Sequence, residues 1–203
     1  MTTTPAKPDP GRVLPPNPRQ AAIVVGSLTL LLWLIELVDV ALPADLDLNG
    51  IIPRALAGLD GIIWMPFLHG GWGHLISNTL PFAVLGFLVM AGGLGQWAAV
   101  TGTIWFTSGV GVWLTGAAGS VHVGASGIVF GWMLFLLVRG VFARSFRQLL
   151  VAVALLAYWG TMLFGVLPGD PRISWQGHLF GALGGVLAAW LVSVANRQVA
   201  VRS

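Results

Sequence analysis

The chain has 203 residues, of which 56% are hydrophobic and only 8% are charged. Soluble domains usually carry about 25% charged residues, so this composition excludes an ordinary soluble globule and indicates an integral membrane protein. The net charge of +3 comes from basic residues scattered over the predicted loops, so no nucleic-acid partner is expected. The absence of cysteine excludes disulfide and thiolate chemistry.

The apolar runs predict the elements in chain order. Residues 1–20 hold six prolines and no apolar run, so we expect a disordered tail. Crossing a bilayer takes roughly 17–25 apolar residues. Six runs are long enough, at approximately 21–42, 73–92, 95–116, 124–142, 147–167 and 177–196. The sequence therefore predicts an all-α membrane protein with one six-helix membrane domain over 21–196 and a short tail at 197–203.

The distribution of Lys and Arg predicts the orientation. Six spans would put both chain ends on one side, and that side collects most of the basic residues: Lys7, Arg12, Arg19, Arg139, Arg144, Arg147, Arg197 and Arg202. The other side has Arg54 and Arg172. Because cytoplasmic loops carry the excess of Lys and Arg, we expect both tails in the cytoplasm. The short Gly- and Ala-rich loops favour a bacterial cytoplasmic membrane.

On this topology, several polar residues share the outer side of the membrane. They are His69, His74, Asn78, His122, Ser126 and His178. Asn78 follows His74 by four residues, so both lie on one helical face. Polar groups at membrane depth are costly and are candidates for function. We interpret His69 and His122 as interfacial polar residues.

Glycines at four-residue spacing predict that the fourth and sixth spans approach closely. The fourth span carries Gly127 and Gly131, and the sixth carries Gly177, Gly181 and Gly185. A tight crossing would bring the hydroxyl at 126 within hydrogen-bond reach of the imidazole at 178. A serine is inert until a base takes its proton, so a serine and a positioned imidazole are the smallest set of groups that can catalyse acyl transfer.

An acyl-transfer site also needs donors for the oxyanion. Ser126 lies in the first turn of a helix, where backbone N–H groups have no intrahelical partner. His74 and Asn78 could add side-chain donors. No acidic partner for His178 is evident in the sequence.

Other interpretations stay open from the residues alone. A Gly-Ser pair in a membrane helix is more often packing than chemistry, and a lone membrane histidine is more often structural. Four histidines on one side could bind zinc, although the sequence has no H-E-x-x-H motif. We interpret Glu36 and Asp39, near the outer end of the first span, as snorkelling or hydrogen-bonded between helices. No metal site and no cofactor are predicted.

Three sequence blocks resemble the rhomboid intramembrane serine proteases. HGGWGHLISN (69–78) matches the family's His-x-x-x-Asn in the second helix, and GASG (124–127) matches its Gly-x-Ser-Gly. GHLFGALGG (177–185) matches its His-x-x-Gly-x-x-x-Gly in the sixth helix. The resemblance covers roughly 62–196 and implies a six-transmembrane-helix rhomboid-like bundle.

The resemblance implies a serine protease that hydrolyses peptide bonds in or near transmembrane segments of membrane proteins. Its partners would be these membrane proteins and the lipid bilayer. Ser126 would be the nucleophile and His178 the general base of a dyad near the outer leaflet. His74, Asn78 and the Ser126 backbone N–H would line the oxyanion hole. Residues expected to support or pack the site are Gly124, Gly127, Phe130, Gly131, Gly181 and Gly185.

The chain departs from the family pattern at several places, including the missing Trp-Arg pair of the first loop and the residue at position 130. Phe130 stands where many members have a tyrosine, so it can stack on the imidazole but cannot hydrogen-bond. The alternatives are an inactive rhomboid-like protein that binds or escorts transmembrane segments, or a histidine-rich metal-binding or transport protein. The sequence does not specify an oligomeric state.

Overall fold

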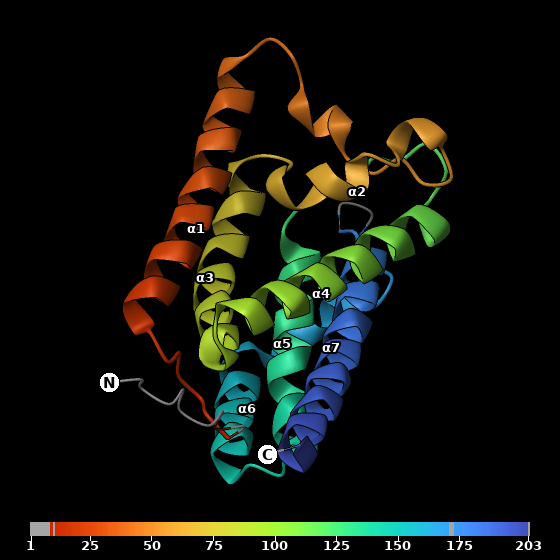
Figure 1. The fold of residues 1–203 in the computed structure, drawn as a ribbon. Coiled ribbons are helices and arrows are strands. Elements are labelled where there is room, and N and C mark those ends of the chain that lie inside the picture. The colour runs from red at the N-terminus through yellow and green to blue at the C-terminus, as the bar shows by residue number, and fades with distance from the viewer. Residues whose placement is uncertain (1–8, 10, 171–172, 203) are drawn as a thin grey trace.

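The computed structural model describes residues 9, 11–170 and 173–202, and this part of the chain is helical without a named β-strand (Figure 1). The long helices are α1 (Pro18–Ala41), α3 (Trp72–Val89), α4 (Leu94–Thr115), α5 (Ser126–Phe142), α6 (Phe146–Trp159) and α7 (Trp175–Arg202). Shorter elements connect them: η1 (Leu46–Asn49), η2 (Leu56–Gly58), α2 (Gly61–Trp64), η3 (Met65–Phe67), η4 (Met90–Gly92) and η5 (Gly160–Val166).

The described residues thus hold seven α-helices rather than the six predicted. The additional helix, α2, has four residues and is too short to cross a bilayer, which needs about 20. Four stretches are long and apolar enough to do so: Pro18–Ala41, Trp72–Gly92, Phe146–Val166 and Trp175–Val199. Helix α5 has only 17 residues, and α4 lies obliquely across α5 and α7 (Figure 1). The all-α membrane architecture holds, and the number of spans stays a prediction.

The predicted tails are partly helical. Pro18–Gln20 form the first turn of α1, where the Asn17 side chain accepts a hydrogen bond from the Gln20 N–H at 3.1 Å. The Arg12 carbonyl accepts a hydrogen bond from Gln148 Nε2 at 3.1 Å. Helix α7 continues to Arg202, because no helix-breaking residue interrupts it. Residues 9 and 11–17 of the predicted N-terminal tail are described and not helical, and residues 1–8 and 10 lie outside the described residues.

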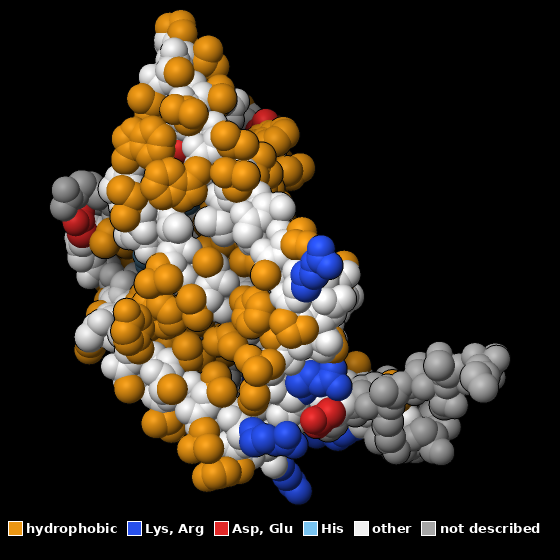
Figure 2. Space-filling view, turned by 90° about the vertical axis from the view of Figure 1, so that its left-hand side faces the viewer, with side chains coloured by type: hydrophobic (Ala, Val, Ile, Leu, Met, Phe, Trp, Pro, Cys, Tyr) orange, Lys and Arg blue, Asp and Glu red, His pale blue; other side chains and the backbone are white. Residues whose placement is uncertain are grey.

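Helix α5 is the centre of the bundle and packs against α3, α4, α6 and α7. Trp132 and Phe135 on this helix are fully buried, and the Trp132 indole N–H donates to Thr101 Oγ1 on α4 at 3.0 Å. Large apolar side chains are instead exposed on the outside of the helix bundle, as a lipid-facing surface requires. Figure 2 shows the side of the molecule that lies on the left in Figure 1. This side is largely hydrophobic, and its Lys and Arg side chains are gathered in the lower half.

Helices α5 and α7 touch through their glycines. A Cβ atom added to Gly181 would overlap the Gly127 carbonyl, and one added to Gly185 would overlap the Gly131 carbonyl. The backbones can therefore meet only because these residues have no side chain. The predicted close approach of the Gly127 and Gly181 helices is confirmed.

Candidate active site

The close contact of α5 and α7 brings together a hydroxyl and an imidazole. Ser126 is the first residue of α5, and His178 lies in the first turn of α7. Ser126 Oγ and His178 Nε2 are 2.8 Å apart, and His178 is buried. This is the hydrogen-bond distance expected between a nucleophile and its general base.

The other nitrogen of the His178 ring defines its tautomer. Nδ1 lies 2.9 Å from the backbone carbonyl of Gly165 in η5. A carbonyl can only accept, so Nδ1 carries the proton of the neutral ring. Nε2 is then left as the acceptor for the Ser126 hydroxyl, the state that a general base requires. A main-chain carbonyl holds the position that a carboxylate takes in a catalytic triad.

The side chain of Phe130 supports the same imidazole. The two rings are stacked, with centroids 3.9 Å apart and planes inclined by only 8°. Phe130 lies one helical turn after Ser126 on α5, so the two residues share a face. A flat, apolar contact fixes the plane of the His178 ring without competing for its nitrogens.

His74, at the start of α3, lines the same cavity as the serine. Its Nδ1 accepts a hydrogen bond from the Gly70 N–H at 3.3 Å, so the proton of the neutral ring is on Nε2. A Cβ atom added to Gly124 would lie 2.7 Å from that Nε2 atom, and Gly124 has φ +119°. Only glycine adopts this backbone conformation without strain while leaving room for the imidazole. His74 thus directs an N–H donor at the segment that begins α5.

Asn78 lies one turn further along α3 and is buried. Its Nδ2 donates a hydrogen bond to the His74 carbonyl at 3.1 Å. The amide has a second N–H, so one donor is left for another acceptor. The sequence prediction that His74 and Asn78 share a face is confirmed by their common place on the wall of one cavity.

That cavity has a volume of about 630 Å³, and its lining includes the four residues predicted to form the catalytic pair and the oxyanion hole. Its lining includes His74, Asn78, Ser126, Phe130, His178 and Asp170. Apolar side chains such as Val129 and Met162 also line it.

His69 is not the interfacial residue that the sequence suggested. It is 1% exposed, and its Nε2 accepts a hydrogen bond from the Ala125 N–H at 3.4 Å. Burial, and secondly the nearby His74, lower its pKa to about 3, so the ring stays neutral and can accept. The ring centroids of His69 and His74 are 5.1 Å apart. His69 therefore contacts both the segment that begins α5 and the ring of His74.

His122 is likewise buried rather than interfacial. Its Nε2 lies 2.8 Å from Ser120 Oγ, and its Nδ1 lies 2.7 Å from Ser174 Oγ, just before α7. The ring thus joins the segment before Ser126 to the segment before the helix of His178. Helical periodicity could not find this contact or that of His69, because both residues lie in non-helical segments.

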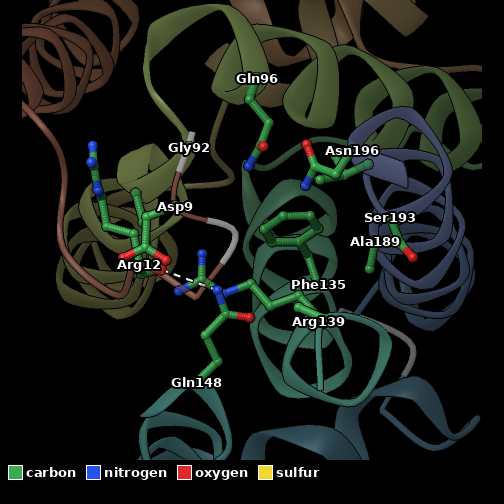
Figure 3. Close-up of a pocket in the computed structure, with 13 residues that line it drawn as sticks. Asp9, Arg12, Gly92, Gln96, Phe135, Arg139, Gln148, Ala189, Ser193 and Asn196 are labelled. Carbon is green, nitrogen blue, oxygen red and sulfur yellow. Dashed lines mark hydrogen bonds between the residues drawn. The ribbon is translucent and has the colours of Figure 1, made fainter. Parts of the chain in front are cut away.

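A second cavity, of about 240 Å³, lies at the other end of α5 (Figure 3). Arg139 lines it and is 6% exposed, and its Nε and Nη2 atoms have no hydrogen-bond partner among the described residues. Gln96 from α4 and Asn196 from α7 face it from the other side (Figure 3). No histidine is among its lining residues. Of these two cavities, only the first is lined by Ser126 and His178.

Metal-ligand geometry occurs away from the histidines. In the described part of the chain, one group of three or more side chains has its ligand atoms close enough to bind a single ion. This group is Asp39, Asp45 and Asp47. Glu36, one turn before Asp39, is 2% exposed and its Oε1 has no hydrogen-bond partner. It therefore does not snorkel to the surface, and that oxygen makes no interhelical hydrogen bond.

These features define a class of protein: an all-helical membrane protein with a serine–histidine pair in a polar cavity at one end of its central helix. The family model described as the Rhomboid domain matches residues 58–195. The chain therefore belongs to the rhomboid family.

Its relatives include bacterial and plant proteins. An uncharacterized protein of Mycobacterium tuberculosis is 43% identical over 188 residues, covering 86% of this chain and 78% of that protein. An uncharacterized protein of Mycobacterium leprae is 42% identical over 193 residues, covering 89% and 76%. Rhomboid-like protein 11, chloroplastic, of Arabidopsis thaliana is 32% identical over 148 residues, covering 63% and 50%. No solved structure matches significantly.

Proposed function

We propose that this rhomboid family member is an intramembrane serine protease that hydrolyses peptide bonds in or near transmembrane segments of membrane proteins. The observation that carries the proposal is the 2.8 Å distance between Ser126 Oγ and His178 Nε2. The tautomer imposed by the Gly165 carbonyl supports it, because Nε2 is then free to accept the serine proton.

The reaction follows from these contacts. As Ser126 Oγ attacks the carbonyl carbon of the substrate, its proton moves to His178 Nε2. The imidazolium keeps its Nδ1–H on the Gly165 carbonyl and gives the Nε2 proton to the departing amine, which leaves an acyl-enzyme. Water then attacks that ester, with the same imidazole as general base, and the serine is regenerated.

The oxyanion formed in each step needs donors. The Ser126 backbone N–H opens α5 and has no intrahelical partner, and the helix dipole there favours negative charge. His74 Nε2–H and the second N–H of Asn78 line the same cavity. We assign the oxyanion hole to these three groups.

The proposed setting is a bacterial cytoplasmic membrane with both ends of the chain in the cytoplasm. The excess of Lys and Arg at the N-terminal end of α1, the α5–α6 connection and the end of α7 supports this orientation. The starts of α3, α5 and α7 would then lie toward the outer leaflet, with the cavity of His74 and Ser126 opening there. Transmembrane proteins would reach it from the lipid.

Two measurements on the purified chain in lipid vesicles test the proposal. A fluorophosphonate reporter should bond to Ser126 Oγ with loss of fluoride, since only an activated serine reacts readily. A co-reconstituted transmembrane substrate should be cut, with a chelator leaving the rate unchanged. Binding of the substrate with neither labelling nor cleavage would support the escort alternative. Cleavage abolished by the chelator would support a metal-dependent protein.

The oxyanion assignment makes a quantitative prediction. His74→Ala should lower kcat about 10²–10³-fold, the usual effect of removing one oxyanion donor, while KM changes little. Steady-state cleavage of the same substrate measures both constants. Ser77→Ala removes a hydroxyl from the same cavity but keeps the proposed donor, and it serves as the control. Equal losses of kcat in the two variants would contradict the assignment.

A further inference from the structure

A buried arginine lines the second cavity, at the end of α5 opposite Ser126. Arg139 lies in the last turn of α5 and is 6% exposed. Its guanidinium carbon is 5.8 Å from the centroid of the Phe135 ring, and its Nε and Nη2 atoms have no hydrogen-bond partner. Within the described residues it forms no ion pair either. A buried charge without a counter-ion is strongly destabilising, so an anion beside this guanidinium would stabilise the fold.

The carboxylate that lines the same cavity is already engaged elsewhere. Asp9 Oδ1 accepts a hydrogen bond from the Gly11 N–H at 2.9 Å, and Asp9 Oδ2 lies 3.8 Å from Arg147 Nη2. Arg12 also lines the cavity, so its described charged side chains are two arginines, at 12 and 139, and this one aspartate. The described lining therefore carries a net positive charge.

Hydrogen-bond donors face Arg139 from two other helices. Gln96 on α4 and Asn196 on α7 extend side-chain amides toward the cavity from the opposite side, and the hydroxyl of Ser193, one turn before Asn196, lines it as well (Figure 3). Amides and hydroxyls donate to oxyanions, and the planar fork of a guanidinium binds phosphate oxygens in pairs. The cavity, with a volume of about 240 Å³, has room for a phosphate group.

The place of the cavity indicates where such a group would come from. Its lining joins the chain before α1, the junction of η4 and α4, and the last turns of α5 and α7. This is the end of the molecule where Lys and Arg side chains gather, in the lower half of Figure 2. On the proposed orientation it meets the cytoplasmic leaflet, which contains anionic lipids. Basic pockets between transmembrane helices on that side bind phosphate headgroups.

We propose that this cavity binds one phosphate group, with Arg139 as its buried anchor and Gln96 and Asn196 as further donors. The headgroup of an anionic lipid and free inorganic phosphate present the same oxyanion to these residues. The bound group would connect α5 with α4, α7 and the segment before α1. Because the site lies at the opposite end of α5 from Ser126, its occupation does not depend on the proposed protease activity.

The test uses the full chain in a nonionic detergent, with thermal unfolding followed by tryptophan fluorescence. One arm adds sodium phosphate and compares it with NaCl at equal ionic strength. The other arm adds short-chain phosphatidylglycerol and compares it with short-chain phosphatidylcholine. In at least one arm the Tm should exceed that of its control by about 5 °C or more, at a concentration of roughly 100 times Kd.

The two arms distinguish the sources of the phosphate. A rise with phosphatidylglycerol alone would support the proposal with a lipid headgroup as the ligand. A rise with inorganic phosphate alone would support it with the free ion as the ligand. No rise above the control in either arm would overturn the proposal.

Three substitutions locate the response. Arg139→Met keeps an apolar side chain but removes the charge, so it should abolish the rise while the Tm of the anion-free protein stays equal or increases. Asn196→Asp, of nearly the same size, places a carboxylate on the opposite wall and should weaken binding about tenfold or more. Arg197→Met removes an exposed arginine at the same end of α7, outside the cavity lining, and should respond as the parent does. An Arg139→Met or Asn196→Asp protein that responds as strongly as Arg197→Met would refute the site.

Discussion

Replacing either Ser126 or His178 with alanine is expected to lower kcat/KM by about 10⁴-fold or more, and replacing both should lower it no further. The two groups act as one device, because the hydroxyl is reactive only while Nε2 at 2.8 Å can take its proton. Once one partner is lost, the other has nothing left to contribute. The measurement is cleavage of a transmembrane substrate in vesicles by both single variants and the double variant.

Ser120→Ala is the matched control for that experiment. Ser120 lines the same cavity, but its hydroxyl donates to the Ala117 carbonyl at 2.7 Å and contacts His122 rather than His178. Its removal should change kcat/KM by less than about tenfold. Additive losses in the double variant, or a Ser120→Ala loss as large as that of Ser126→Ala, would contradict the assigned dyad.

The second large effect is expected at the contact of α5 and α7. Gly181→Ala introduces a methyl group that overlaps the Gly127 carbonyl, and a backbone carbonyl cannot move aside as a side chain can. We expect a loss of about 3 kcal/mol in stability, the upper end of the usual cost of overpacking. Cleavage should fall as well, because separating the helices moves His178 from Ser126. Thermal unfolding and the vesicle assay measure the two effects.

Gly102→Ala provides the comparison within the same fold. Gly102 lies inside α4, and an added Cβ atom would meet nothing within 4 Å. Alanine should therefore stabilise the helix there by roughly 0.5–1 kcal/mol. If Gly102→Ala and Gly181→Ala destabilised the protein equally, the loss would reflect glycine replacement in general and not the helix contact.

The sequence predicted the long helices well because each is a long apolar run bounded by polar or glycine-rich residues. The predicted run 73–92 corresponds to α3 and η4, and 95–116 corresponds to α4 with a shift of one residue. The glycine spacing also predicted which two helices touch. This information is local in the chain, or repeats with the period of one helical turn, so it can be read without coordinates.

The parts that could not be predicted depend on contacts between distant segments. Helix α6 ends at Trp159 and continues as the 3₁₀ segment η5, although the apolar run extends further. Only the fold reveals that this segment presents a carbonyl to the imidazole of His178. In the same way, only the fold reveals that the loop after α1 brings Asp45 and Asp47 close to Asp39.

The Gly165 carbonyl that holds His178 Nδ1 has a consequence for mutational scanning. The acceptor is main chain, so every substitution at 165 retains the atom that orients the base. What a substitution changes is space: a Cβ at Gly165 would lie 2.8 Å from the Phe130 ring and 3.1 Å from His178 Nδ1. A scan of side chains would therefore report position 165 as a steric constraint and overlook its electronic role. Exchanging the amide between residues 165 and 166 for an ester, which weakens the carbonyl as an acceptor, would separate the two.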